Sequence, residues 1–188
     1  MYKLITAAAS EPLTTDEIKL HLKVDFSADD ALILRLGKAI RKSLESEMRR
    51  QFVTATWELY LDSFEDLIYL EKSPVSSVTS VKYYDSDNNI QTLATTVYET
   101  DLVSEPARVA LAYSQQFPTI RNRTNAVVIR FVAGYADADN VPEDIKEIML
   151  LLISYYYDNR GEEMTQARIK ALMMSAGWMI SKQKLFRF

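Results

Sequence analysis

The sequence predicts an α+β protein, with a helical core of two N-terminal and one or two C-terminal helices and an antiparallel β insertion between them. Near both ends of the chain, apolar residues recur at three- and four-residue spacing, the pattern of one buried helix face. Between these regions the spacing changes to alternation, which points side chains to opposite faces of a strand. Neither helical half has enough apolar surface for a core of its own, so we expect the two halves to pack together.

We expect four segments along the chain. They are residues 1–51 for the N-terminal helices of the core, 52–136 for the β insertion, 137–176 for the C-terminal helices and 177–188 for a C-terminal tail. A length of 188 residues suits one domain with a sizeable insertion. Because the helices on either side of the insertion must still meet, Phe52 and Ala136 should lie close together.

Two helices are predicted before the insertion. Thr14 and Glu17 have the spacing of a capping box, which begins a short helix that ends near Lys23. A longer helix from about residue 28 to 50 follows from its apolar stripe: Ile33, Leu36, Ile40, Leu44 and Met48. Its other face mixes charges of both signs, which favours a solvated or partner-facing surface over a nucleic-acid stripe. That face is formed by Arg35, Lys38, Lys42, Glu45 and Arg49.

The β insertion is predicted from short runs of alternating residues. The expected strands are about 53–61, 67–70, 78–84, 90–93, 97–103, 108–112 and 126–133. Pro, Gly, Asn, Asp and Ser separate these runs, as in turns. Strands of this length and spacing indicate an antiparallel sheet or a small sandwich.

Helices return after Val141, where Pro142 suits the first helical position. A third helix is predicted from the stripe Ile145, Ile148, Met149, Leu152 and Tyr156, and it should end at Gly161. A shorter fourth helix is expected over about 165–175. We expect the second and third helices to pack through Leu36, Ile40, Leu44, Ile148, Met149 and Leu152.

Composition argues against most catalytic chemistry. The chain has no cysteine, and its one histidine, His21, lies in the short first helix, where a structural role is expected. Its four glycines do not make a nucleotide-binding loop. The net charge of −4 argues against a protein that mainly grips nucleic acid. No apolar run of about 18 residues exists and no signal peptide is predicted, so we expect no membrane span.

Two acidic clusters have side chains of the type that binds metal ions. Asp85, Asp87 and Asn89 begin like a calcium loop, but Ile90 replaces the required glycine and Thr96 the bidentate glutamate, so a hairpin turn is predicted. The second cluster lies at the start of the third helix, where carboxylates complement the helix dipole. Its members are Asp137, Asp139, Glu143 and Asp144. We therefore expect no catalytic residue, no metal and no cofactor.

Several strings, in order along the chain, resemble the head-to-tail connector (adaptor) proteins of long-tailed bacteriophages and prophages, in the subgroup with a β insertion between its helices. They are LTTDEIKLHLKVD at 13–25, ALI at 31–33, SPV at 73–75, VTSVKYYD at 78–85, FVAGY at 131–135, VP at 141–142 with IK at 145–146, and YYDNR at 156–160. Two features depart from the family: Asn88-Asn89 stands where relatives commonly have glycine, and the C-terminal end is rich in methionine and aromatic residues.

The resemblance implies a structural protein of the virion head-tail junction, assembled in the host cytoplasm, that is not an enzyme. It would form a homo-oligomeric ring of about twelve subunits. The ring would dock under the portal protein, extend the DNA channel and give the tail a platform, with the β insertion on the ring periphery or its tail-facing surface. DNA would pass through transiently and non-specifically, because a ring of acidic subunits does not hold it tightly. No membrane partner is implied.

Three other functions stay open at this point. A stopper or tail-completion protein would also be a ring component without chemistry. A nucleic-acid-binding regulator would use the helix around residues 38–50, against its glutamates and the net acidity. An undetected hydrolase is the third.

The segment 178–188 is predicted to dock onto the portal or a neighbouring subunit. It carries three large aromatic residues and three basic ones, which are side-chain types suited to an interface. The residues of this hypothesis are Trp178, Met179, Ile180, Lys182, Lys184, Leu185, Phe186, Arg187 and Phe188. The alternative is that the tail folds back and completes the core.

Overall fold

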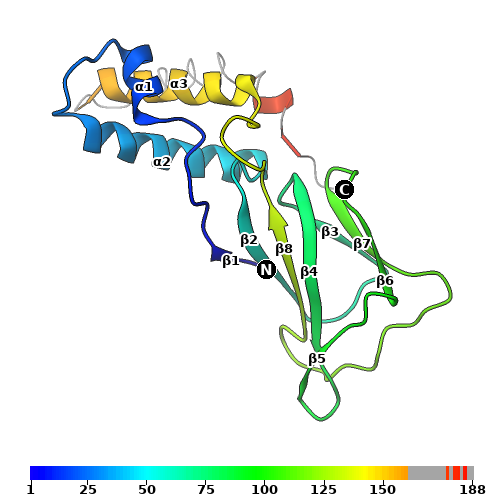
Figure 1. Ribbon diagram of the computed structural model, residues 1–188. Coiled ribbons are helices and arrows are strands. Elements are labelled where there is room, and N and C mark those ends of the chain that lie inside the picture. The colour runs from blue at the N-terminus through cyan, green and yellow to red at the C-terminus, as the bar shows by residue number, and fades with distance from the viewer. Residues whose placement is uncertain (161–176, 178–179, 183, 186–188) are drawn as a thin grey trace. The chain divides into compact units, whose positions relative to one another are not determined.

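The computed structural model describes residues 1–160, 177, 180–182 and 184–185. The chain forms two compact units (Figure 1). The β unit comprises Met1–Ala9 and Thr54–Tyr135, and the helical unit comprises Ser10–Val53 and Ala136–Phe188. The α+β class and the antiparallel β insertion between helices are confirmed. In the described part of the chain, no helix is long and apolar enough to cross a membrane.

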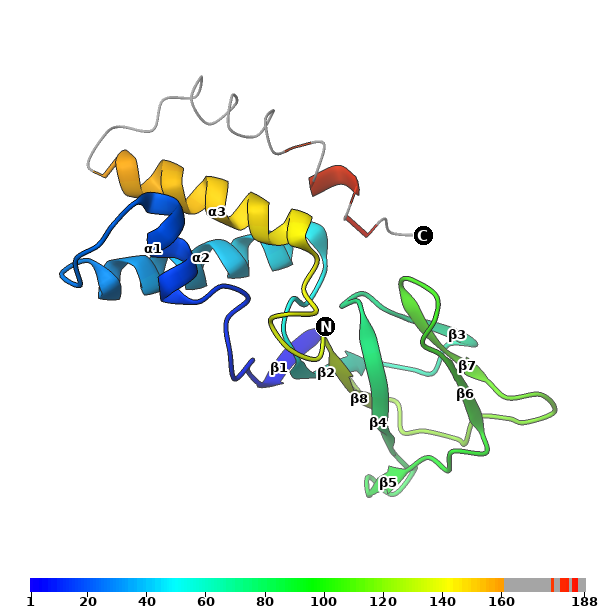
Figure 2. The ribbon, with the colours of Figure 1, turned by 45° about the horizontal axis from the view of Figure 1, so that its top comes forward.

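The helical unit contains α1 (Thr15–Leu22), α2 (Asp30–Met48) and α3 (Glu143–Asp158). The predicted capping box is present: the Thr14 hydroxyl accepts the backbone N–H of Glu17 at 3.2 Å, and Glu17 Oε2 accepts the Thr14 N–H at 2.6 Å. The expected fourth helix, over about 165–175, lies outside the described residues. Figure 2 shows α1 lying against both longer helices.

The core of the helical unit forms where α2 and α3 pack together. Of the six residues expected at this contact, Ile40, Leu44, Ile148 and Met149 are buried. The other two, Leu36 and Leu152, are half-buried. Further fully buried side chains extend the same stripes: Ile33, Met48, Ile145 and Ile153.

Polar contacts join the start of α2 to the end of α3. The Tyr157 hydroxyl donates to Asp29 Oδ2 at 2.5 Å, and Arg160 Nη1 donates to the same oxygen at 3.1 Å. Lys19 of α1 forms an ion pair with Asp30 at 2.8 Å. These bonds fix the first turn of α2 against both neighbouring helices.

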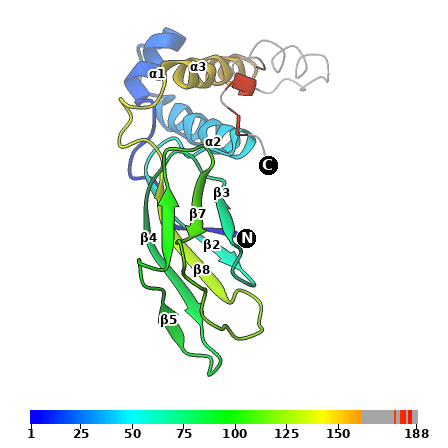
Figure 3. The same ribbon diagram turned by 90° about the vertical axis from the view of Figure 1, so that its right-hand side faces the viewer.

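Within the described residues, eight strands build the β unit, and every pairing is antiparallel. They are β1 (Tyr2–Thr6), β2 (Ala55–Leu61), β3 (Leu67–Leu70), β4 (Val75–Tyr84), β5 (Ile90–Thr92), β6 (Tyr98–Asp101), β7 (Ala107–Leu111) and β8 (Val127–Ala133). A five-stranded sheet has the order β1-β2-β8-β4-β5, and a three-stranded sheet has the order β3-β7-β6. The two sheets face each other (Figures 1 and 3) across a core that includes Leu59, Leu70, Ile129 and Phe131.

The N-terminus differs from the expected division. Residues 1–9 were expected with the helices, but they belong to the β unit because β1 pairs with β2. Tyr2 anchors this strand: its ring meets Phe131 edge to face at 6.2 Å, and its hydroxyl donates to the Tyr69 carbonyl at 3.1 Å. Both partners are distant in sequence, and five residues of alternation are too short to identify a strand alone.

The two ends of the β segment meet, as expected for an insertion. The Thr54 backbone N–H donates to the Tyr135 carbonyl at 3.1 Å, and the Thr54 hydroxyl donates to the same oxygen at 2.8 Å. These residues neighbour Phe52 and Ala136. The chain therefore enters and leaves the sandwich at one point.

Candidate partner-binding surfaces

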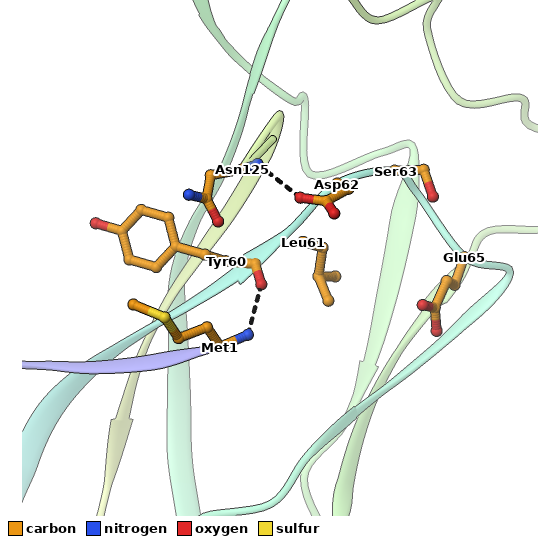
Figure 4. Close-up of a pocket in the computed structure, with 7 residues that line it drawn as sticks. All are labelled: Met1, Tyr60, Leu61, Asp62, Ser63, Glu65 and Asn125. Atoms are coloured by element: carbon orange, nitrogen blue, oxygen red, sulfur yellow. Dashed lines mark hydrogen bonds between the residues drawn. The ribbon is translucent and has the colours of Figure 1, made fainter. Parts of the chain in front are cut away.

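A small open pocket lies at the end of β2, lined by Met1, Tyr60, Leu61, Asp62, Ser63, Glu65 and Asn125 (Figure 4). Two bonds across it are structural. The Met1 amine donates to the Tyr60 carbonyl at 2.8 Å, and the Asn125 backbone N–H donates to Asp62 Oδ1 at 2.7 Å. This lining contains no histidine, lysine or arginine to act with its carboxylates or with Ser63. We therefore assign it no chemistry.

The first acidic cluster forms the predicted hairpin turn between β4 and β5. Asp85 Oδ1 accepts the backbone N–H groups of Asp87 at 3.1 Å and Asn89 at 2.8 Å, and Oδ2 accepts Gln91 Nε2 at 2.8 Å. The bond from Gln91, followed by the backbone bond from Asn89, holds the pKa of Asp85 below its ordinary value. Asn88 supplies the left-handed position of the turn, with φ 67°. The carboxylate is thus used by the turn itself.

The second acidic cluster and the one histidine both lie in the helical unit. Asp137 Oδ1 accepts the backbone N–H and the side-chain amide of Asn140, while Glu143 and Asp144 lie in the first turn of α3. His21 is exposed on α1. Within residues 1–160 and the described positions of the tail, no group of three His, Cys, Asp or Glu side chains could hold a metal ion.

Glu45 corrects the predicted outer face of α2. This residue was expected on a solvated or partner-facing surface, but it is 8% exposed. Its Oε2 accepts Arg41 Nη1 at 2.8 Å, and its Oε1 accepts Gln51 Nε2 at 2.8 Å and the Phe52 backbone N–H at 2.9 Å. Arg41 also donates to Glu11 at 2.6 Å. The physical reason is the turn after α2, which returns residues 51–52 to the helix and supplies donors that helix periodicity cannot reveal.

The rest of that face agrees with the prediction. Arg35, Lys38 and Lys42 are exposed, and Arg49 is half-buried at the end of the helix. The exposed cations of this face are therefore Arg35, Lys38 and Lys42, while Glu45 is buried.

The C-terminal docking segment is described only in part. Ile180 and Leu185 are buried, Lys182 is exposed, the Leu185 backbone N–H donates to the Met48 carbonyl at 3.0 Å, and Lys184 pairs with Glu47. Trp178, Met179, Phe186, Arg187 and Phe188 lie outside the described residues. The described contacts run to the C-terminal end of α2, and the docking hypothesis stays a prediction.

The outer face of the five-stranded sheet carries a cluster that the sequence analysis missed. Inward-pointing Leu59, Val81 and Ile129 are buried, so their strand neighbours point outward. We name this outer surface the basic sheet face; it comprises Lys3, Glu58, Tyr60, Lys82, Tyr84 and Arg130, with Arg121 and Arg123 beside it. The alternation of charged and apolar residues along β4 and β8 is visible in the sequence. The sheet order that places these strands side by side is not.

Glu58 lies at the centre of the basic sheet face. Arg130 Nε and Nη2 donate to Glu58 Oε1 at 2.9 and 2.6 Å, and the Tyr60 hydroxyl donates to Oε2 at 2.5 Å. Burial favours the neutral acid, but the bonds from Tyr60 and Arg130 and the Arg130 charge hold the pKa of Glu58 below its ordinary value. Glu58 thus orders the face while leaving cations in excess.

Two arginines lie at the hairpin end of the face, beside Asp85 and Asp87 of the turn. The Arg123 guanidinium lies 3.8 Å from the centre of the Tyr84 ring, and its Nη1 donates to Asn88 Oδ1 at 3.0 Å. Arg121 is exposed on the same loop. Stacking holds Arg123 in place with its charge retained.

The outer side of the three-stranded sheet has the opposite character. We name it the acidic sheet face; it comprises Leu67, Tyr69, Glu99, Asp101, Arg108 and Ala110, flanked by exposed Glu65, Asp66 and Glu105. Asp101 accepts the Ser104 hydroxyl at 2.6 Å and Arg108 Nε at 3.1 Å. These two bonds, that from Ser104 first, hold the pKa of Asp101 well below its ordinary value.

The structure is that of an α+β protein with a helical unit and a small antiparallel β sandwich. Solved structures with a similar fold include chains of gene transfer agent (GTA) particles. A chain from the neck of the empty particle, computed with C6 symmetry, and one from the virion of the native particle each have a TM-score of 0.79 at 22% identity. A chain from the neck of the native particle, computed with C12 symmetry, has a TM-score of 0.77 at 22% identity.

Each similarity covers 100% of this chain and 97% of the other. At this level of identity the similarity establishes the shared fold. No family model matches the chain, and no curated protein matches it.

Proposed function

We propose that the chain is a structural subunit of the head-to-tail connector ring of a tailed phage or a related particle. It docks under the portal, extends the DNA channel and provides the platform for tail attachment. The observation that carries this proposal is the fold, which matches neck chains of GTA particles over the whole length of this chain. The assembly takes place in the host cytoplasm, and the finished ring lies at the head-tail junction.

The strings that resemble phage connectors coincide with ordered structural features. VTSVKYYD is most of β4 and the start of its hairpin turn, and FVAGY is the end of β8 and the residues that follow. The YYDNR string contains Tyr157 and Arg160, which bind Asp29 at the start of α2. The strings therefore lie in strands, in a turn and at the contact between α2 and α3.

A structural role also accounts for the polar groups. Glu45, Asp85 and Asp101 are each engaged in bonds that hold a helix end, a hairpin or a strand pair. A catalytic acid or base needs a proton-transfer partner and access to substrate instead. We therefore propose that the chain is not an enzyme and needs no cofactor.

We assign two parts to the C-terminal segment. Burial of Ile180 and Leu185 supports a role in completing the helical unit. The docking role toward the portal or a neighbouring subunit is proposed for the aromatic and basic residues beyond them, Phe186, Arg187 and Phe188, together with Trp178. Aromatic and arginine side chains are the types that dominate interface energies.

A stopper or tail-completion protein is the second candidate. The similarity is to chains of the neck, and it does not distinguish one ring of the neck from another. One experiment separates the two: a reconstruction of the parent particle, with this chain fused to a density tag. A tagged ring directly under the portal supports the connector. A tagged ring farther from the head supports the stopper, and a particle without the tag contradicts both.

A further inference from the structure

We propose that the β unit binds a second copy of the chain head to tail, with the basic sheet face of one copy against the acidic sheet face of the next. This inference rests on the proposed ring and assigns its contact surfaces. The supporting observation is that basic residues gather on the outer face of one sheet and acidic residues on that of the other.

The division of charge runs against the composition of the unit. Acidic residues outnumber basic ones in the β unit, yet most of its basic residues gather on or beside one sheet. These are Lys3, Lys82, Arg121, Arg123 and Arg130, and the carboxylates there are Glu58 on the face and Asp62, Asp85 and Asp87 at its edge. The acidic sheet face holds Glu99 and the flanking Glu65, Asp66 and Glu105, while its Arg108 is paired with Asp101.

Each face offers charges that are available to a partner. Lys82 is exposed on β4 in the basic sheet face, and Glu99 is exposed on β6 in the acidic sheet face. Among the described residues, neither takes part in an ion pair. Charges of opposite sign on two surfaces steer their encounter and fix their register.

Apolar groups accompany the charges on both faces. Leu67 is 37% exposed on the acidic sheet face, and Val103, in the loop between β6 and β7, is 95% exposed. The basic sheet face contributes half-buried Tyr60, and half-buried Val128 and Val132 of β8 point to the same side of the sheet. A mixture of apolar and charged groups, with a tyrosine among them, is the composition of a protein interface.

The placement of the two faces selects head-to-tail association. The two sheets share one core, so their outer faces lie on opposite sides of the sandwich (Figure 3). A twofold dimer would set either face against itself and bring like charges together, which is unfavourable. When unlike faces join, each pair of subunits still has one free basic sheet face and one free acidic sheet face. Further copies can therefore add through the same contact, and the chain of subunits closes into a ring when the rotation between neighbours allows it.

DNA is the other partner that the basic sheet face could bind. Phosphate contacts need several available cations, and here Arg130 is paired with Glu58 and Arg123 is held by Asn88 and Tyr84. DNA would also leave the acidic sheet face without a role. A second copy uses both faces, so we favour it, and DNA binding becomes an outcome of the test.

Because the chain has no cysteine, disulfide cross-linking tests the contact directly. Full-length Lys82→Cys and Glu99→Cys variants are oxidised alone, mixed, and as the double variant, in low salt. We expect a disulfide dimer in the mixture, little from either variant alone, and a ladder of oligomers from the double variant. The control pairs Glu99→Cys with Lys38→Cys, which places the thiol on the exposed side of α2 and should give no dimer.

Charge reversal supplies the second measurement. Lys82→Glu and Glu99→Lys should each weaken self-association about tenfold in sedimentation, and mixing them should restore it, because unlike charges meet again. Lys38→Glu is the matched control and should leave self-association unchanged. Rising salt should weaken the wild-type contact.

The inference is overturned if the mixture gives no more dimer than the control pair, or if reversal leaves self-association unchanged. The face would instead be assigned to DNA by two results together: Lys82→Glu loses binding to a short DNA duplex, and the Lys82→Cys and Glu99→Cys variants form no cross-link. Particles that contain this ring but lack the cross-link would refute the contact and leave the proposed function standing. Cross-linked oligomers of a chain absent from particle necks would refute the function and leave the contact standing.

Discussion

Arg41 and Glu45, one turn apart on α2, form a buried ion pair in which Arg41 Nη1 donates to Glu45 Oε2 at 2.8 Å. The pair connects three pieces of the helical unit. Arg41 also reaches Glu11 in the segment before α1, and Glu45 also accepts the Phe52 backbone N–H beyond α2. Breaking it should therefore disturb the segment before α1 and the turn after α2 at once.

Glu45→Ala should lower the free energy of unfolding by about 3–5 kcal/mol, because it leaves Arg41 and the Phe52 N–H buried with fewer partners. Chemical denaturation of the full chain measures the change. Lys42→Ala, exposed on the same helix, is the control and should stay within about 0.5 kcal/mol of wild type. A Glu45→Ala loss no larger than that of the control would show that the network carries little stability.

Ile40→Ala tests the contact between α2 and α3. Ile40 is 5% exposed, so removal of its side chain should cost about 2–5 kcal/mol through lost burial and a cavity. Thermal or urea unfolding measures the loss, with Lys38→Ala as the exposed control two positions away. A loss below about half a kcal/mol would contradict the proposed pairing of the two helices.

The two parts assigned to the C-terminal segment can be separated by paired substitutions. Leu185→Ala should lower the free energy of unfolding by about 2 kcal/mol or more, because the side chain is buried. Phe188→Ala should leave stability within about 0.5 kcal/mol of wild type and reduce incorporation into portal-containing particles. Deletion of 178–188 should combine both effects. Equal destabilisation by both substitutions would make the whole segment core and remove the docking proposal.

Asp101 gives a prediction in pH. Its pKa is held well below the ordinary 3.8, so the stability it contributes is present above that value and is lost as pH falls through the folded-state pKa. An NMR titration of the carboxyl carbon should therefore show a midpoint well below 3.8. Arg108→Met removes both Arg108 bonds to Asp101 and should raise the midpoint toward that value. A wild-type midpoint at the ordinary value would contradict the Ser104 and Arg108 contacts.

Sequence by itself determined the elements with strong local signals. The Thr14–Glu17 capping box, the apolar stripe of α2 and the hairpin at Asp85 appear as expected, because each depends on residues within a few positions of one another. Leu67–Leu70 was predicted with its observed boundaries for the same reason. The stripe of α3 appears except at its end, where Tyr157 is buried and Tyr156, which was expected in the stripe, is exposed.

Tertiary structure decided the features that depend on distant partners. β1 exists because β2 pairs with it, and Glu45 points inward because Gln51 and Phe52 return to meet it. Lys82 and Arg130 share a face because the order β2-β8-β4 places their strands side by side, whereas Glu99 lies on the other sheet. Local periodicity shows which side of a strand a residue occupies, but only the long-range pairing of strands determines which residues meet there.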